Sequence, residues 1–305
     1  MPDLLVVGDA NPDLVLRGGD VVPAFGQREH LVEHADLTLG GSGAIMACGA
    51  ARLGLEVAIV AVVGHDELGR FTRERLRSAG VDDRHVQVAD RQATGISVGL
   101  VSEEEDRAML TAAGAIAALD PDAVPDELLR SARHVHLSSL FLQPLLAAGA
   151  ARLIERAHDV GASTSIDTGW DPADQWALPT QALHEVDVLL PNAEEAMRLA
   201  GGADDPREAA KALAAAGATV ALKLGADGAV AFTADEAVEL PAPAVDAVDA
   251  TGAGDSFDAG FIAAWLEGEG LAAALALGVA CGALSTRDAG GTAAQPTLAE
   301  ARALT

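Results

Sequence analysis

The segment Asp249–Phe261, DATGAGDSFDAGF, places three small residues directly before an aspartate. Apolar residues follow with helical spacing, so we predict that the turn Gly252-Ala253-Gly254 stands at the N-terminus of a helix. Backbone N–H groups are free at such a terminus and the helix dipole adds positive charge, so the turn can form an anion hole for a phosphoryl group. Asp255 is placed to accept a proton from an attacking hydroxyl. The alternative is a plain glycine-rich helix cap, with Asp255 as a partner of the dipole.

A second glycine-rich segment, TLGGSGAIMACGAARLG from Thr38 to Gly54, opens another predicted helix. Glycines allow the backbone to approach a ligand closely, although tight packing of a helix on a sheet would account for them equally well. The segment also has the outline of a nucleophile elbow centred on Ser42. Its last position is Ala44 and no Asp/His order supports a triad, which disfavours a serine hydrolase.

The elements that must position these segments alternate between strand and helix. Helices are predicted at about 43–53, 66–79, 145–160, 192–200 and 206–216, and a core helix from Leu271 to Leu284. Strands are predicted at Leu4–Gly8, Val57–Val63, His134–Leu137, Ser163–Asp167, Val186–Leu190 and Thr219–Leu222. The alternation predicts an α/β fold with a doubly wound, mainly parallel sheet and helices on both faces. The continuously apolar strands agree, because parallel strands are buried on both sides.

Two stretches break this alternation, at about 13–38 and 94–112. Their alternating, partly polar pattern predicts antiparallel strands outside the main sheet, which we interpret as a small β lid. We expect one domain, 1–305, carrying this lid. Because exposed lid strands need covering, we also expect a homodimer joined through them.

The net charge of −26, from 20 basic and 46 acidic residues, argues against nucleic acid and against an anionic membrane surface as partners. The N-terminus lacks the pattern of a signal peptide, and no apolar stretch is long enough for a convincing transmembrane helix, so we expect a cytoplasmic protein. Cys48 and Cys281 lie in apolar helical segments and are expected to be buried thiols, not a disulfide.

The chain resembles the ribokinase-like (PfkB) carbohydrate kinases over residues 4 to about 297. The resemblance lies in the order and spacing of Gly40–Gly54 and Asp249–Phe261, and in VVGDANPDLVL at Val6–Leu16, PNAEEA at Pro191–Ala196 and KLGADG at Lys223–Gly228. It implies transfer of the ATP γ-phosphate to a primary hydroxyl of a small neutral sugar or sugar-like substrate. A nucleoside kinase acting on an adenosine-like substrate is the alternative. A sugar-sensing protein that kept the fold but lost catalysis is a third hypothesis.

The resemblance also implies roles for the matching residues. Asp255 would be the general base, and Gly252, Ala253 and Gly254 the anion hole. Asn11 and Asp13 would bind substrate hydroxyls, and Gly41 would approach the sugar. Substrate contacts are therefore expected at Asn11, Asp13, Gly41, Ser42 and Ile45.

Two departures from the family pattern bear on the substrate. Ser42 stands where several sugar and phosphosugar kinases carry Lys, and Ile45 where the family usually has Asn. We therefore expect a neutral substrate that turns an apolar edge toward Ile45, because a phosphorylated one would need Arg or Lys in the pocket. Arg28 and Arg91, near the lid segments, could supply that charge.

The nucleotide and its cations are expected at three further places. Lys223, Gly225 and Gly228 match positions that contact ATP. Asn192 and Glu195 would organise Mg²⁺ through water, although without the resemblance this pair reads as a helix cap. The family commonly binds a monovalent cation, such as K⁺, through carbonyls near Asp249 and Thr251.

The remaining notable residues have mainly structural interpretations. His134 and His136 share one face of a strand but lack metal-ligand partners, which favours a core role. The acidic run Glu103–Asp106 is interpreted as a solvated hairpin turn. Phe25, Phe141 and Trp170 could stack on a substrate ring, although each is more often part of a core.

Overall fold

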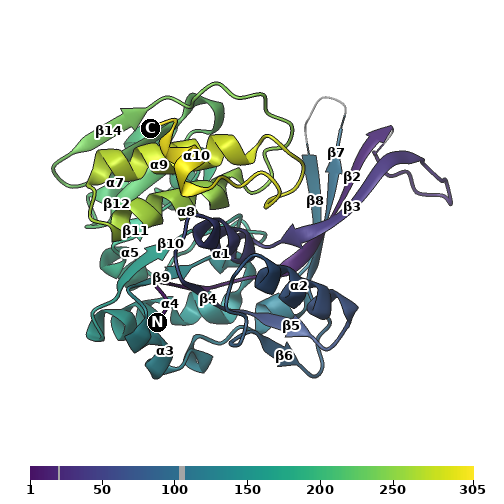
Figure 1. Cartoon of the computed structure of the whole chain (residues 1–305), viewed down its shortest axis with the longest axis horizontal. Helices are drawn as coiled ribbons and strands as arrows, with labels where there is room; N and C mark the ends of the chain where they lie inside the picture. The colour runs from purple at the N-terminus through teal and green to yellow at the C-terminus, as the bar shows by residue number, and fades with distance from the viewer. Residues whose placement is uncertain (20, 103–106) are drawn as a thin grey trace.

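An eight-stranded sheet forms the centre of the fold in the computed structural model, which describes residues 1–19, 21–102 and 107–305 (Figure 1). Its strands lie in the order β14-β13-β12-β11-β10-β9-β1-β4. Their bounds are β1 Leu4–Val7, β4 Val57–Val60, β9 His134–Leu137, β10 Ser163–Ile166, β11 Val188–Leu189, β12 Thr219–Lys223, β13 Ala229–Phe232 and β14 Ala237–Leu240. All pairs from β4 to β12 are parallel, whereas β13 and β14 add an antiparallel edge. The carboxyl ends of the six parallel strands therefore meet along one side of the sheet.

Helices cover both faces of this sheet and bury an apolar cluster on each side (Figure 1). One face carries α1 Ser42–Arg52, α2 Glu67–Ser78, α8 Ala253–Leu266, α9 Leu271–Ser285 and α10 Leu298–Arg302. The other carries α3 Asp126–Ser131, α4 Pro144–Asp159, α5 Thr180–Glu185, α6 Ala193–Leu199 and α7 Pro206–Ala214. The predicted α/β fold, a mainly parallel sheet with helices on both faces, is confirmed.

Some predicted elements differ in detail. The run Val57–Val63 is not one strand: β4 ends at Val60, and β5 (Val62–Gly64) pairs instead with β6 (Gln87–Ala89). The antiparallel hairpin of β13 and β14 was missed, because its strands are only four residues long and lie among small and polar residues. Short one- or two-turn helices such as α3 and α5 were also missed, since each has only six residues.

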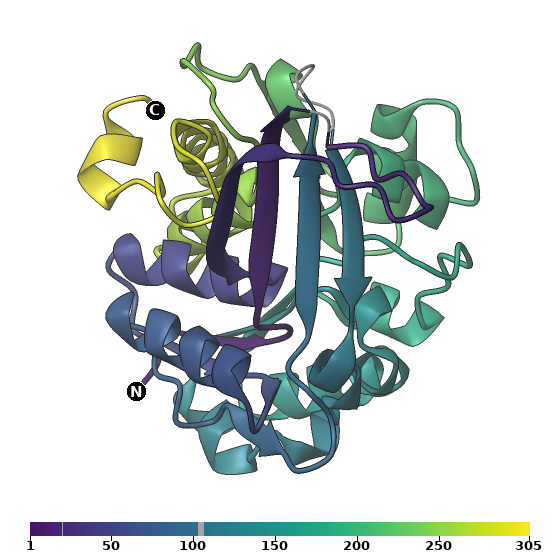
Figure 2. The same cartoon turned by 90° about the vertical axis from the view of Figure 1, so that its right-hand side faces the viewer.

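A second, four-stranded sheet projects from the main body with the order β3-β2-β7-β8 (Figure 2). It consists of β2 Asn11–Gly19, β3 Val32–Gly40, β7 Ile96–Val101 and β8 Arg107–Ala112. The two hairpins, β2 with β3 and β7 with β8, are antiparallel, as expected. In contrast, β2 and β7, which a long segment of chain separates, pair in parallel. We call these four strands the lid. The acidic run Glu103–Asp106 lies outside the described residues.

Buried polar and thiol groups have structural roles in this core. Cys48 and Cys281 are free and buried, as predicted. His134 and His136 are fully buried, and their rings hydrogen-bond the hydroxyls of Ser163 and Ser165. Burial lowers the pKa of His134 to about 3 and that of His136 to about 4, so both are neutral. Among the described residues, no helix is long and apolar enough to cross a membrane.

The packing of α8 on α9 depends on glycine. A Cβ added at Gly260 would lie 2.6 Å from the carbonyl oxygen of Leu277 and 2.8 Å from the sulfur of Cys281. On the facing helix, a Cβ at Gly278 would lie 3.0 Å from the ring of Phe257. The two backbones therefore approach closely, which fixes α8 and with it the glycine-rich turn at its N-terminus.

We predict that Gly260→Val lowers the free energy of unfolding by about 1–3 kcal/mol, because overpacking forces the two helices apart. Urea denaturation followed by circular dichroism measures the change. Ala212→Val, on the exposed surface of α7, is the control and should cost only helix propensity, about 0.5 kcal/mol. Equal losses in the two variants would show that the close approach does not matter.

Candidate active site

The N-terminus of α8 lies at the carboxyl edge of the main sheet, where the predicted anion hole and general base come together. Gly252 is the N-cap and adopts φ 72°, a conformation that favours glycine, and α8 starts at Ala253. The N–H of Ala253, which was expected to be free for an anion, instead donates to the carbonyl of Ala250 at 3.2 Å. The N–H groups of Gly254 and Asp255 belong to the first turn, which has no preceding turn to bond, and they remain available to an anion.

Asp255 lies in a pocket of other carboxylates. Burial, the charge of Asp167 and the charge of Asp9 raise its pKa to about 8, against an opposing effect of Lys223. The hydroxyl of Ser42 hydrogen-bonds its carboxylate and favours the ionised form. The raised pKa makes the ionised Asp255 carboxylate a stronger base, which is the property that proton abstraction from a hydroxyl requires.

Lys223, which is predicted to contact ATP, is engaged with side chains of the protein itself. Its ammonium group is buried between two carboxylates, 2.7 Å from Oδ2 of Asp167 and 3.1 and 3.2 Å from the two oxygens of Asp258. The carboxylates of Asp167, Asp255 and Asp258 each place an oxygen within 4.8 Å of the others. Lys223 thus joins the ends of β10 and β12 to the first turns of α8.

The substrate residues predicted from the first strand also converge. Asn11 and Asp13 are both buried, and Nδ2 of Asn11 donates to Oδ1 of Asp13 at 3.0 Å. A Cβ at Gly40 would lie 2.0 Å from Cγ of Asp13, and one at Gly41 would lie 2.9 Å from Oδ1 of Asn11. Gly41 has φ 85° as well. The two glycines therefore make room for this pair of polar side chains, as a substrate-binding role requires.

Ser42 and Ile45, both in α1, have different surroundings. Ser42 faces Asp255, as described above. Ile45 is only 3% exposed. A Cβ added at Gly252 would lie 2.9 Å from one of its methyl groups, and a Cβ added at Gly291 would lie 2.5 Å from the other. Ile45 therefore packs against the glycine turn, and a substrate contact at this residue stays a prediction.

Asn192 and Glu195 form a capping box at the start of α6. Oδ1 of Asn192 accepts the N–H of Glu195, and both oxygens of Glu195 accept hydrogen bonds from Asn192. Burial and the nearby charge of Asp167 raise the pKa of Glu195 to about 7. Oxygen donors with an excess of negative charge fit Mg²⁺, which keeps much of its water shell. The helix-cap interpretation is confirmed, and the magnesium role of the same side chains stays a prediction.

Two loops are predicted to bind ligands; hydrogen bonds to the Asp249 carboxylate hold one of them, and glycines shape the other. Oδ1 of Asp249 accepts from the N–H and hydroxyl of Thr251, and Oδ2 accepts from the N–H of Gly290 at 2.8 Å. This closes the loop that a monovalent cation would occupy. The turn from β12 to β13 needs Gly225 and Gly228, whose φ values are 60° and 100°.

The predicted aromatic residues do not gather around one ring site. Phe25 is fully exposed at the far end of the lid, so it belongs neither to a core nor to a closed pocket. Phe141 and Trp170 each contact Trp176 edge-on, with centroids 5.6 and 5.1 Å apart. Phe141 is half-buried, whereas Trp170 stays 57% exposed, so only Phe141 is largely accounted for by packing.

Three site residues were missed from sequence: Asp9, Asp167 and Asp258. Asp9 follows β1 and accepts the N–H of Gly43 at 2.9 Å, which anchors the start of α1. Asp9 and Asp167 each follow a buried parallel strand, and that position alone places them at the carboxyl edge where ligands bind. Asp258 follows Asp255 by three residues, so the two share a helix face. The strand-end positions of Asp9 and Asp167 and the spacing of Asp255 and Asp258 are visible in the sequence.

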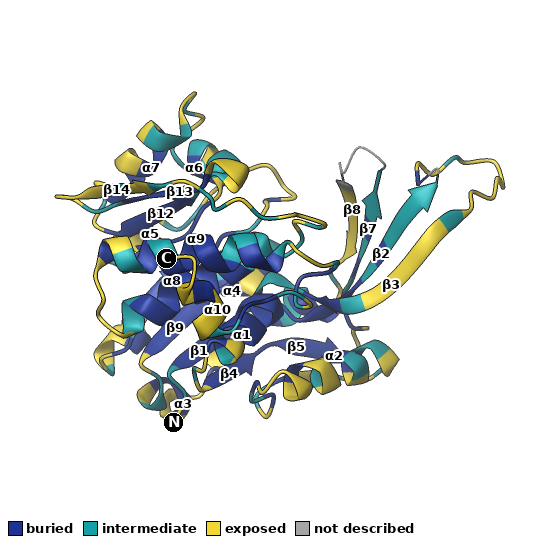
Figure 3. Ribbon diagram, turned by 45° about the horizontal axis from the view of Figure 1, so that its top comes forward, coloured by how far each residue is buried: buried dark blue, intermediate teal, exposed yellow. Residues whose placement is uncertain are grey.

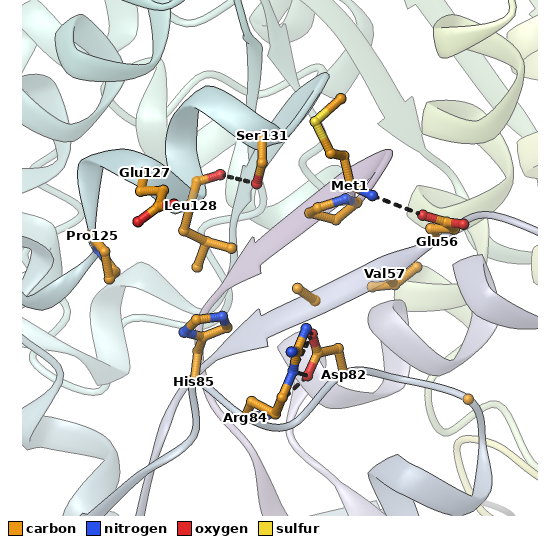
Figure 4. A pocket seen from close by; sticks show the side chains of 13 residues that line it. Met1, Glu56, Val57, Asp82, Arg84, His85, Pro125, Glu127, Leu128 and Ser131 are labelled. Atoms are coloured by element: carbon orange, nitrogen blue, oxygen red, sulfur yellow. Dashed lines mark hydrogen bonds and ion pairs between the residues drawn. The ribbon is translucent and has the colours of Figure 1, made fainter.

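One hollow in the described structure lies away from this site. It has a volume of about 630 Å³ and is found at the opposite edge of the sheet, around Met1, Glu56 and His85 (Figure 4). Its charged groups bind one another, since Met1 pairs with Glu56 and Arg84 with Asp82. We assign no chemistry to it.

Comparison with known proteins agrees with this geometry. The model of the pfkB family of carbohydrate kinases matches residues 1–298. An ATP-dependent ribose-1-phosphate kinase of Halopiger xanaduensis is 34% identical over 93% of this chain and 92% of its own length. A ribokinase of Haemophilus influenzae is 28% identical over 97% of this chain and 96% of its own. The structure of Arabidopsis thaliana ribokinase with ribose and ATP is similar at a TM-score of 0.85 and 25% identity, over 99% of this chain and 98% of that one. The chain belongs to the pfkB family of carbohydrate kinases.

Proposed function

We propose that this ATP-dependent carbohydrate kinase transfers the γ-phosphate to a primary hydroxyl of a small neutral sugar or sugar-like molecule. The observation that carries the proposal is the position of Asp255, with its raised pKa, directly after a glycine turn whose helix N-terminus faces the same space. A base and an anion hole side by side are what phosphoryl transfer to a hydroxyl needs.

In the proposed mechanism, Asn11 and Asp13 hold the substrate so that its hydroxyl lies against Asp255. The Asp255 carboxylate accepts the hydroxyl proton as the oxygen attacks the γ-phosphorus, and the bond from that phosphorus to the bridging oxygen breaks to release ADP. The N–H groups of Gly254 and Asp255 stabilise charge on the phosphoryl oxygens during transfer. When bound, Mg²⁺ would neutralise phosphate charge near Asn192 and Glu195, and K⁺ would order the loop at Asp249 and Thr251.

The neutral charge of the substrate is supported by where the cations lie. Lys223, beside the anion hole, is committed to Asp167 and Asp258 and cannot also bind a substrate phosphate. Ser42 offers a hydroxyl in place of a cation, and it is engaged with Asp255. Arg28 and Arg91 are both exposed. Around Asp255 itself, a substrate phosphate would meet the negative charges of Asp9 and Asp167.

A riboside or other nucleoside is the second candidate. It is favoured by an aminoimidazole riboside kinase of Salmonella typhimurium that is 30% identical over 97% of this chain. The relatives described above are named for ribose or ribose 1-phosphate. Free ribose, ribose 1-phosphate and a riboside differ in the group at the first carbon of the ribose ring, so that group separates the candidate substrates.

A coupled ADP-release screen tests the proposal, with ribose, other pentoses, hexoses, a keto-deoxy sugar acid, adenosine, ribose 1-phosphate and fructose 6-phosphate as acceptors. We expect the highest kcat/KM with an uncharged acceptor, and stimulation by K⁺ over a large organic cation at equal ionic strength. A sugar phosphate as the best acceptor would contradict the neutral pocket, and a nucleoside would select the second candidate.

We predict that Asp255→Asn lowers kcat by about 10²–10⁴-fold while ATP affinity and folding stay nearly unchanged, because the amide cannot accept the proton. Steady-state kinetics with the acceptor from the screen measures the loss. Asp246→Asn, at an exposed position before the same loop, removes the same charge and should retain full activity. A loss below threefold at Asp255 would exclude it as the base.

We also propose that the lid closes over the substrate and joins two copies of the chain. Its surface carries exposed apolar side chains at Leu37, Met109 and Leu110, and β3 is largely exposed along its length (Figure 3). Closure would exclude water, which otherwise competes as acceptor.

Light scattering at micromolar concentration should therefore give twice the chain mass, and Leu110→Asp should give the mass of one chain, because a buried carboxylate opposes association. Leu145→Asp on α4, where the leucine is 50% exposed against 61% for Leu110, should leave the dimer intact. A wild-type monomer would rule out the lid interface.

A further inference from the structure

A second cavity, of about 520 Å³, lies between α1, α2, the end of β3 and the loop that precedes α10. We call it the arginine pocket. Its polar lining comes from Thr38, Arg52, Arg75, Ser78, Thr292 and Gln295. Its volume is in the range of small-molecule sites. None of the proposed substrate, nucleotide or cation residues lines it.

The pocket has a local charge opposite to that of the protein. Two arginines line it and none of its 11 lining residues is acidic, although the chain carries 46 acidic residues and a net charge of −26. An anion is repelled by the protein as a whole, so a site that binds one must supply local positive charge. The arginine pocket does so.

Both arginines are free to bind a ligand. In the described parts of the chain neither Arg52 nor Arg75 forms an ion pair, whereas Arg73 and Arg77, on the same helix as Arg75, both pair with Asp83. The charge of Arg52 helps to lower the pKa of Glu300, but no hydrogen bond joins these two described residues. The Glu300 carboxylate accepts its hydrogen bonds from Thr297.

Arg75 is also held in place without using its donors. Its guanidinium carbon lies 5.0 Å above the centre of the Phe71 ring, one turn earlier on α2. Stacking on a ring fixes the plane of the guanidinium and leaves its N–H groups at the edge, where they can form paired bonds to a phosphate. Arg52 is in the last turn of α1, so the two cations come from different helices and face one cavity.

The floor of the pocket is connected to the catalytic helix. Gln295 is 2% exposed, and its amide donates to the carbonyl of Ile45 at 2.8 Å and to the hydroxyl of Ser256 at 3.1 Å. Ser256 follows Asp255 in α8. A ligand in this pocket would therefore rest on the same side chain that holds α1 against the first turn of α8.

We propose that the arginine pocket binds a small phosphorylated molecule, with one phosphate group between Arg52 and Arg75. Arginine recognises phosphate by two parallel hydrogen bonds, and the hydroxyl of Thr292 adds a donor. This site is separate from the one that holds ATP and sugar, so it adds a binding function to the kinase.

Isothermal titration calorimetry of the full chain with inorganic pyrophosphate tests the proposal, without magnesium and at fixed ionic strength. We expect saturable binding that weakens at least about tenfold in Arg52→Met/Arg75→Met, since each charge-assisted bond contributes roughly that much. The double variant Arg130→Met/Lys211→Met removes two exposed cations elsewhere, leaves the same net charge, and should bind like the wild type.

The single variants Arg52→Met and Arg75→Met should each show an intermediate loss, and all variants should melt within a few degrees of the wild type, because both arginines are exposed and unpaired. Wild-type protein that binds no pyrophosphate, or a double variant that binds it as tightly as the wild type, would overturn the proposal. Malonate bound as tightly as pyrophosphate would overturn the assignment to phosphate.

Discussion

One buried ammonium group joins the parts of this kinase that must stay together. Lys223 lies between Asp167 at the end of β10 and Asp258 in α8, and it extends from the end of β12. Removing one partner of such a buried group typically costs about 3–5 kcal/mol, because the remaining charges are left uncompensated. The contact therefore sets where α8 begins relative to the sheet. It also places a positive charge against an otherwise acidic edge.

The rest of the site follows from this arrangement. Asp255 is one turn before Asp258 on the same helix, so fixing Asp258 fixes the base. Glycines then allow close packing at the site. Gly40 and Gly41 leave room for the side chains of Asp13 and Asn11, and Gly252 leaves room for that of Ile45. The chain is acidic overall, yet its anion hole depends on backbone N–H groups and a helix dipole, which work at short range even when the long-range field is unfavourable.

Sequence reasoning succeeded where a pattern has one physical meaning. Apolar strands alternating with helices predicted the parallel sheet, and small residues before Asp255 predicted a helix N-terminus. Sequence reasoning was less informative where a residue type fits several environments. A lysine at a strand end reads as a nucleotide contact, and only the fold reveals that Asp167 and Asp258, distant in sequence, enclose Lys223. In the same way, only the fold reveals that Ile45 packs against Gly252 and Gly291.

The pH dependence of kcat/KM tests the central claim, that the half-buried Asp255 is the general base, most directly. This parameter reports ionisation in the free enzyme. Burial and neighbouring carboxylates raise the pKa of Asp255 to about 8, and only the ionised form accepts a proton. We therefore predict that kcat/KM rises about tenfold per pH unit up to a pH near 8 and then levels off. A profile already flat from pH 5 upward would show that Asp255 is ionised throughout, or is not the base, and would contradict this account.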